Sequence, residues 1–146
     1  MDEYERAAAE LRRLIETFDK VSLYSVVDSQ TDDEDCLSVR TIISHVVNAG
    51  YGYAAYIRGA LSLAGDRPPK RLLSYGEVLG EYDVMLKFTI GTLDGRWEMP
   101  DETIRAIRIQ TGWEVVYDPE QRLEHAFVHI LRHRRQFERL RAATPG

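Results

Sequence analysis

Apolar residues recur at steps of three and four through most of this chain, which is the period of an amphipathic helix. Residues 3 to about 26 carry the first stripe, and the alanines near its start favour helix. The stripe consists of Leu11, Leu14, Ile15, Phe18 and Val21. Residues 28–35 hold turn-forming and acidic side chains without an apolar period. They are therefore predicted to form a loop.

A second stripe follows Ser38, whose hydroxyl can cap the start of a helix. Its members are Ile42, Val46, Ala49, Tyr53, Ile57, Ala60 and Ala64. Gly65 is expected to end this helix, because Pro68 and Pro69 prevent its continuation. The stripe also contains three glycines, which permit close helix packing or leave room for a pocket. They are Gly50, Gly52 and Gly59.

A third helix is predicted from near Tyr75 to about Leu93, where Asp94 and Gly95 stop it. Residues 96–117 fit neither a helical nor a strand period well. We interpret them as a long irregular connection that lines a pocket, since long loops are often functional.

The last helix has a clear beginning. Asp118 is a capping residue, Pro119 suits the first helical position, and Gln121 completes the spacing of a capping box. This helix is predicted to run to about Arg141. Four long helices without a convincing sheet indicate an all-α fold, a four-helix bundle, with residues 1–146 forming one domain.

Composition narrows the function classes. The net charge is -5 and the pI is near 5.4, whereas a protein that grips nucleic acid usually presents a basic face. The arginines between residues 132 and 141 fit a solvated face near a helix C-terminus, where cations suit the helix dipole. No nucleic-acid partner is expected.

The cellular setting can also be predicted. Cys36 is the only cysteine, so no internal disulfide can form, and a reducing, cytoplasmic location is expected. The charged N-terminus does not resemble a signal peptide. No apolar run approaches the roughly 18 residues of a membrane span, so no membrane association is expected.

Candidate chemistry is concentrated in the four histidines. His125, His129 and His133 follow one another at steps of four on the last predicted helix. Side chains at this spacing are neighbours on one side of a helix. Two imidazoles can then reach a single ion with metal–nitrogen bonds of about 2.0–2.1 Å.

The helical wheel ranks these three histidines. The expected core face contains Leu123, Ala126, Phe127 and Ile130. At about 100° per residue, His133 lies nearest to this face, His129 comes next and His125 is farthest away. His129 and His133 are therefore the better ligands, and His125 is an outer partner or alternative ligand.

His45 is the expected third ligand, because it lies beside the buried stripe of the second helix. Three histidines leave coordination positions open, as catalytic metal sites do. Two alternatives stay open at this point. His45 alone could be a hydrogen-bonded core residue, and the histidines of the last helix could form a solvated face that responds to pH.

The chain resembles the DinB-like (DinB/YfiT) family of metal-binding bundles. The resemblance lies in LSVR ahead of His45, in Trp113 followed by Tyr117 and Asp118, and in the HxxxHRRQ that runs from His129 to Gln136. The family often has HxxxHRGQ, so Arg135 replaces a frequent glycine. This departure affects packing or a dimer contact rather than the ligands.

The resemblance implies an up-down-down-up bundle with a long crossover connection, often as a homodimer. It also implies that His45, His129 and His133 bind a divalent ion, commonly zinc or nickel. Members of the family include metal-dependent hydrolases, transferases of low-molecular-weight thiols and proteins without an assigned reaction.

Two classes of function follow. One is a metal-dependent hydrolase or thiol S-transferase that acts on a small molecule, with Tyr53, Tyr56 and Trp113 lining its pocket. These aromatics could equally be ordinary core residues. For hydrolysis, Glu124 is a candidate proton acceptor. For thiol transfer, a cationic rim is expected from Arg40, Arg58 or Arg134. The other class is a non-catalytic, metal-stabilised, stress-associated homodimer.

Overall fold

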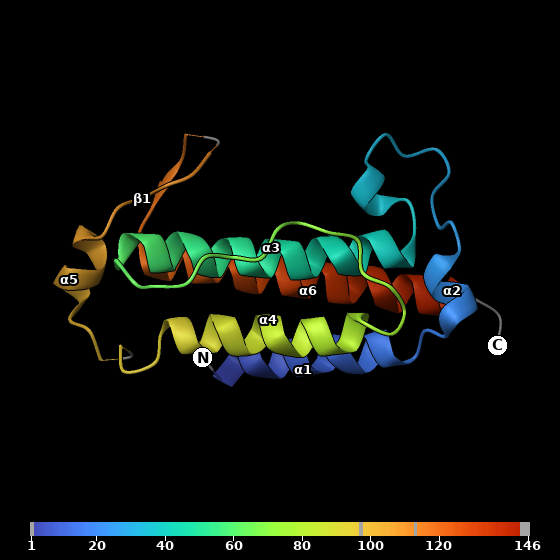
Figure 1. The fold of residues 1–146 in the computed structure, drawn as a ribbon, viewed down its shortest axis with the longest axis horizontal. Helices are drawn as coiled ribbons and strands as arrows, with labels where there is room; N and C mark the ends of the chain where they lie inside the picture. The colour runs from blue at the N-terminus through green and yellow to red at the C-terminus, as the bar shows by residue number, and fades with distance from the viewer. Residues whose placement is uncertain (1, 97, 113, 144–146) are drawn as a thin grey trace.

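Four long helices dominate the protein. A computed structural model describes residues 2–96, 98–112 and 114–143. In it the long helices lie side by side (Figure 1). They are α1 (Asp2–Glu16), α3 (Val39–Ala60), α4 (Val78–Thr92) and α6 (Pro119–Ala143). The prediction of a mostly helical chain is confirmed. No helix in the described ranges has the length and apolar character needed to cross a membrane.

Each long helix contacts two of the others. α3 packs against α4 and α6, and α1 packs against the same two helices. α1 and α6 run in one direction and α3 and α4 in the other, while residues 61–77 return along α3 to the start of α4 (Figure 1). The side chains fully buried between the helices include Leu11, Ile42, Ile43, Tyr82, Met85 and Phe137.

The predicted length of the first helix is wrong. α1 ends at Glu16, and a short helix α2 (Lys20–Tyr24) follows after a break. Asp19 causes the break, because its carboxylate accepts a hydrogen bond from the Ser22 amide at 2.8 Å and caps α2. Val21, placed on the buried stripe by its spacing, is consequently 78% exposed.

The predicted loop at residues 28–35 is confirmed apart from a short 3-10 helix, η1 (Glu34–Cys36). α3 begins as predicted, with a capping box between Ser38 and Thr41. However, α3 ends at Ala60 and not at Gly65. Ser62 adopts a positive φ of 53°, which leaves the helical path, and the Arg58 guanidinium donates to the Ala64 carbonyl.

Residues 96–117 are more regular than predicted. They contain α5 (Asp101–Ala106) and a hairpin of β1 (Ile109–Gln110) with β2 (Val116–Tyr117), in which Ile109 pairs with Tyr117. Ile109 is buried in a small apolar cluster with Ile57 and Leu93. This cluster attaches the hairpin to the bundle near the C-terminal end of α3. The apolar positions within residues 96–117 are too isolated in the sequence to show a helical or strand period.

The last helix begins as the sequence predicts. The Gln121 amide donates to the Asp118 carboxylate at 2.8 Å, and the Asp118 amide donates to the Gln121 side-chain oxygen at 3.1 Å. This reciprocal pair fixes the start of α6. The register of α6 against α3 then determines which histidines face the bundle.

Candidate metal centre

Three of the four histidines meet between α3 and α6. One ring nitrogen from each of His45, His129 and His133 lies within 4.8 Å of the other two. The Nε2 atom of His129 is 3.1 Å from Nε2 of His45 and 3.2 Å from Nε2 of His133. We call these residues the histidine trio. They are close enough together to bind a metal ion.

The separations within the trio can be compared with those around a bound ion. Two nitrogens that each lie about 2.0–2.1 Å from one ion are about 2.9 Å apart at a right angle and about 3.4 Å apart at the tetrahedral angle. The observed separations of 3.1 and 3.2 Å fall inside this range. Two of the three nitrogen pairs of the trio are therefore spaced like ligands of one metal ion.

Two polar side chains orient two rings of the trio through hydrogen bonds at their Nδ1 atoms. The Asp35 carboxylate lies 2.8 Å from Nδ1 of His45, and the Gln136 side-chain oxygen lies 2.9 Å from Nδ1 of His133. Both oxygens accept hydrogen bonds, so each Nδ1 carries the proton and each Nε2 presents a lone pair. Such partners behind a metal-binding histidine orient the ring and increase its basicity.

Electrostatics favour neutral imidazoles at His129 and His133. Burial and the neighbouring histidines lower the pKa of His129 to about 3. Burial lowers the pKa of His133 to about 4. His129 can donate a proton to only one of its two neighbours, so at least one pair of nitrogen lone pairs faces each other. A cation between them would remove this repulsion.

His125 does not belong to the trio. It lies one helical turn before His129, is exposed, and contacts the rings of Tyr53 and Tyr117 at centroid distances of 5.5 and 5.9 Å. This position agrees with the helical wheel, which places His125 farthest from the core face. Its role as an outer partner or alternative ligand stays a prediction.

A cavity of about 300 Å³ lies beside the trio, and His45 forms part of its wall. Tyr53, Tyr56 and Gly52 also line it. Tyr53 contacts the His129 ring at a centroid distance of 5.4 Å, so it connects the cavity with the trio. Trp113, the third predicted pocket residue, lies outside the described residues. We call this space the inner cavity.

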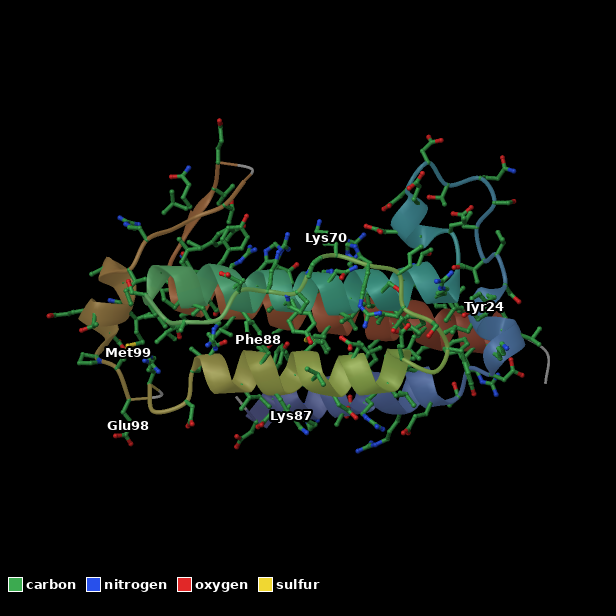
Figure 2. The ribbon with its side chains drawn as sticks, viewed as in Figure 1. Tyr24, Lys70, Lys87, Phe88, Glu98 and Met99 are labelled. Atoms are coloured by element: carbon green, nitrogen blue, oxygen red, sulfur yellow. The ribbon has the colours of Figure 1, made fainter. Side chains whose placement is uncertain are left out.

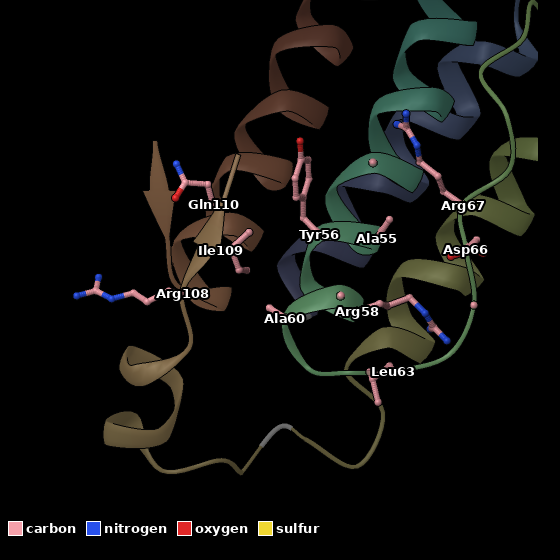
Figure 3. Close-up of a pocket in the computed structure, with 13 residues that line it drawn as sticks. Ala55, Tyr56, Arg58, Ala60, Leu63, Asp66, Arg67, Arg108, Ile109 and Gln110 are labelled. Carbon is pink, nitrogen blue, oxygen red and sulfur yellow. The ribbon is translucent and has the colours of Figure 1, made fainter. Parts of the chain in front are cut away.

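A second cavity of about 600 Å³ continues toward the C-terminal end of α3 (Figure 3). Gly52, Tyr56 and Arg67 line both cavities, which are therefore adjacent. The outer wall comes from the hairpin, where Ile109 and Gln110 line the space and the Gly112 amide donates to the Tyr56 hydroxyl at 3.3 Å. Parts of residues 96–117, which were predicted to be an irregular connection, thus form a cavity wall.

Arg122 is a buried cation in the wall of the inner cavity, with only 1% of its surface exposed. Its guanidinium lies over the rings of Tyr53 and Tyr56, 4.5 and 4.8 Å from their centroids, and 5.5 Å from that of Tyr117. Burial lowers the pKa of Arg122, but an arginine stays charged at neutral pH. The three rings stabilise this charge through cation–π contacts.

The cations predicted for the rim lie elsewhere. Arg40 donates to the Leu73 carbonyl at 2.6 Å, and Arg134 forms ion pairs with Glu10 and Glu138. Arg58 lines the larger cavity but donates to the Ala64 carbonyl.

Two other predicted positions also lie away from the inner cavity. Glu124, the candidate proton acceptor, is exposed on α6. Gly50 packs against Met85 of α4, whereas Gly52 lines both cavities.

Comparison with family models, with curated proteins and with solved structures finds no match for this chain. The resemblance to DinB-like proteins therefore stays a prediction that rests on the sequence motifs.

Five residues of the site were given no role by the sequence pattern: Asp35, Arg67, Lys70, Arg122 and Gln136. Gln136 follows His133 by three residues, the spacing of neighbours on one helix face, and this signal could have identified it. Asp35, Arg67 and Lys70 lie in segments without a period. Only the folded path of those segments brings them to the site.

Proposed function

We propose that this chain is a DinB-like protein that binds a divalent ion through the histidine trio and acts as a low-molecular-weight thiol S-transferase. One observation carries the proposal: three Nε2 atoms converge beside a cavity of about 300 Å³. Three protein ligands with a free position are typical of catalytic rather than structural sites. A cavity of this size suits a small-molecule substrate.

The path of the chain supports the DinB-like part of the proposal. The long helices run in two opposite directions, and residues 61–77 form a long connection between two that run in the same direction (Figure 1). These directions support the up-down-down-up bundle with a crossover connection that the resemblance implies. Zinc and nickel are the proposed ions, because neutral imidazole suits both.

The proposed reaction joins a thiol to an electrophilic carbon. The sulfur attacks the carbon and forms a C–S bond, the bond to the leaving group breaks with its electron pair, and the thiol proton passes to solvent. A divalent ion bound by the trio would lower the pKa of a coordinated thiol. Asp35 and Gln136 hold the imidazoles in the required tautomer, and Tyr53 and Tyr56 shape the space for the acceptor.

Hydrolysis is the second candidate and needs a proton acceptor near the reacting water. Among the described residues that line the inner cavity, Asp35 is the single carboxylate, and it is bonded to His45. Glu124 is exposed on α6 and does not line this cavity. Thiol transfer is therefore favoured, because a thiolate needs no separate base once the thiol pKa has been lowered.

A non-catalytic, metal-stabilised homodimer is the remaining alternative. It requires no access to the ion, whereas His45 forms part of the wall of a cavity. The position of His45 in this wall supports an enzyme. A cytoplasmic location belongs to the same proposal, since an exposed thiol substrate persists in a reducing compartment.

The test compares two chromogenic reactions on protein loaded with zinc or nickel. One combines cysteine with chlorodinitrobenzene, and the other is the hydrolysis of nitrophenyl acetate. We expect thioether formation by the wild type and its loss in His129→Ala, with His125→Ala as the matched control. Ester hydrolysis without thiol transfer would favour the hydrolase. A fully loaded protein that is inactive in both assays would favour the non-catalytic alternative.

A further inference from the structure

The inner cavity is lined by more positive than negative charge. Among the described residues around it, Arg67, Lys70 and Arg122 are cations and Asp35 is the single carboxylate. Asp35 is already engaged with His45. Since the whole chain is acidic, with a net charge of -5, this local excess of positive charge is a property of the cavity and not of the protein surface in general.

Two of these cations lack a fixed partner. Arg67 and Lys70 are exposed on the segment that crosses α3, and neither forms a hydrogen bond or ion pair with any residue in the described ranges. Lys70 lies on the side of α3 that this segment covers (Figure 2). In contrast, Arg71 in the same segment forms ion pairs with Glu77 and Glu81. Arg67 and Lys70 are therefore available to a ligand.

Gly52 allows Arg67 to lie directly against α3. A Cβ atom at position 52 would be 3.3 Å from Nη1 of Arg67, which is tight for any side chain. The guanidinium of Arg67 is directed back along α3, away from the C-terminal end of that helix, whereas Arg108 on the hairpin points outward (Figure 3). Arg67 thus faces the space that leads to the trio.

The distance between the two ends of this space follows from helix geometry. His45 and Gly52 are seven residues apart on α3, which corresponds to about 10 Å at 1.5 Å per residue. A ligand that reaches the trio at one end would therefore place a group beside Arg67 about 10 Å away.

We infer that the inner cavity selects an elongated organic anion, with its reactive end at the histidine trio and an acidic group, a carboxylate or phosphate, held by Arg67 and Lys70. Arg122 adds a positive charge to the wall of the same cavity. This inference rests on the proposed function for the reactive end. The anion subsite itself requires only the cations.

The experiment uses calorimetry on the zinc-loaded full chain at low salt, with straight-chain thiols as probes. Each probe carries a thiol at one end and either a carboxylate or a hydroxyl at the other. We expect ω-mercaptooctanoate, whose ends are about 10 Å apart, to bind about tenfold more tightly than the matching mercapto-octanol. The shorter mercaptopropionate, which cannot span both subsites, should lose this advantage.

Variants assign the effect to the cations. Arg67→Gln combined with Lys70→Gln should weaken ω-mercaptooctanoate about tenfold and leave the mercapto-octanol and the zinc content unchanged. Arg139→Gln removes an exposed arginine of α6 that lies outside the cavity. This variant should change neither the binding of the two probes nor the zinc content. Equal binding of acid and alcohol by the wild type, or unchanged binding of the acid by the double variant, would overturn the inference.

A thiol-free arm separates this inference from the proposed function. Octanoate and octyl phosphate should bind to metal-free protein and lose affinity in the double variant, and the tighter of the two identifies the preferred acidic group. If this dependence appears while the thiol adds no affinity in the zinc-loaded protein, the anion subsite is supported and the proposed thiol chemistry fails. If neither anion binds, the subsite fails whatever the thiol does.

Discussion

The histidine trio and the cations of the inner cavity are neighbours, but the chain builds them in different ways. The trio comes from two long helices, and Asp35 and Gln136 hold two of its rings. Arg67 and Lys70 come from an irregular segment and have no fixed partner among the described residues. Ligands held by hydrogen bonds suit a bound ion, whose bond lengths vary little, whereas exposed cations without a protein partner are available to an anionic substrate.

The contrast between the two regions fails if the three histidines do not bind zinc together. His45→Ala or His133→Ala should lower zinc affinity by at least about a hundredfold, because each removes one of three ligands. Competition with a chromophoric chelator measures this affinity. Arg67→Gln is the matched control from the other region and should stay within about threefold of the wild type. A histidine variant that retains full affinity would contradict the assignment.

The second prediction concerns the stability of metal-free protein at low pH. The folded pKa values of His129 and His133 are about 3 and 4, below the ordinary value of about 6.5. Below about pH 6.5 the unfolded chain therefore binds protons that the folded chain does not. The two histidines therefore contribute fully to the free energy of unfolding above this pH. Their contribution is lost as pH falls toward 4, by up to about 1.4 kcal/mol per histidine for each pH unit.

Urea unfolding at a series of pH values measures this loss. His129→Gln should reduce the dependence of the unfolding free energy on pH, because one of the two histidines with a lowered pKa is removed. A free energy of unfolding that is constant between about pH 6.5 and pH 4.5 would contradict the burial of neutral imidazoles.

The residues behind the trio provide a third, smaller effect. Asp35→Asn and Gln136→Met should each lower zinc affinity about 10- to 100-fold without abolishing binding, because they disturb the orientation and basicity of a ligand. The same chelator competition measures this effect. Asp32→Asn, in the same acidic stretch, is the control. If the control weakens zinc binding as much as Asp35→Asn, general negative charge and not the contact with His45 would be responsible.

The smallest predicted effect tests packing apart from chemistry. A Cβ atom at Gly50 would lie 2.3 Å from the Met85 sulfur, so Gly50→Ala should destabilise the fold. Overpacking costs about 1–3 kcal/mol, and the better helix propensity of alanine offsets up to about 1 kcal/mol. Chemical denaturation measures the change, and zinc affinity should remain within about threefold. A large loss of affinity would place Gly50 in the site after all.

The same contrast explains how much could be predicted from the sequence. Helix periodicity and capping residues predict the start of α3 and both ends of α4 and α6 within a few residues, because local rules govern them, whereas the predicted end of α3 at Gly65 is too late. The wheel ranks the histidines of α6 in the order that the structure shows. The break at Asp19 was missed because one capping bond overrides a weak apolar period. The anion-binding cations could not be predicted, since residues 61–77 have no period and their path depends on contacts such as the Leu73 amide with Ser44.

Metal binding by the histidine trio is tested by the metal content of the purified protein, measured by elemental mass spectrometry for the wild type, His129→Ala and His125→Ala. This binding predicts a near-stoichiometric divalent ion in the wild type and in His125→Ala, and its loss in His129→Ala, whose ring contacts both other members of the trio. A wild type that binds no zinc or nickel at neutral pH, or a His129→Ala variant that keeps its ion, would contradict it.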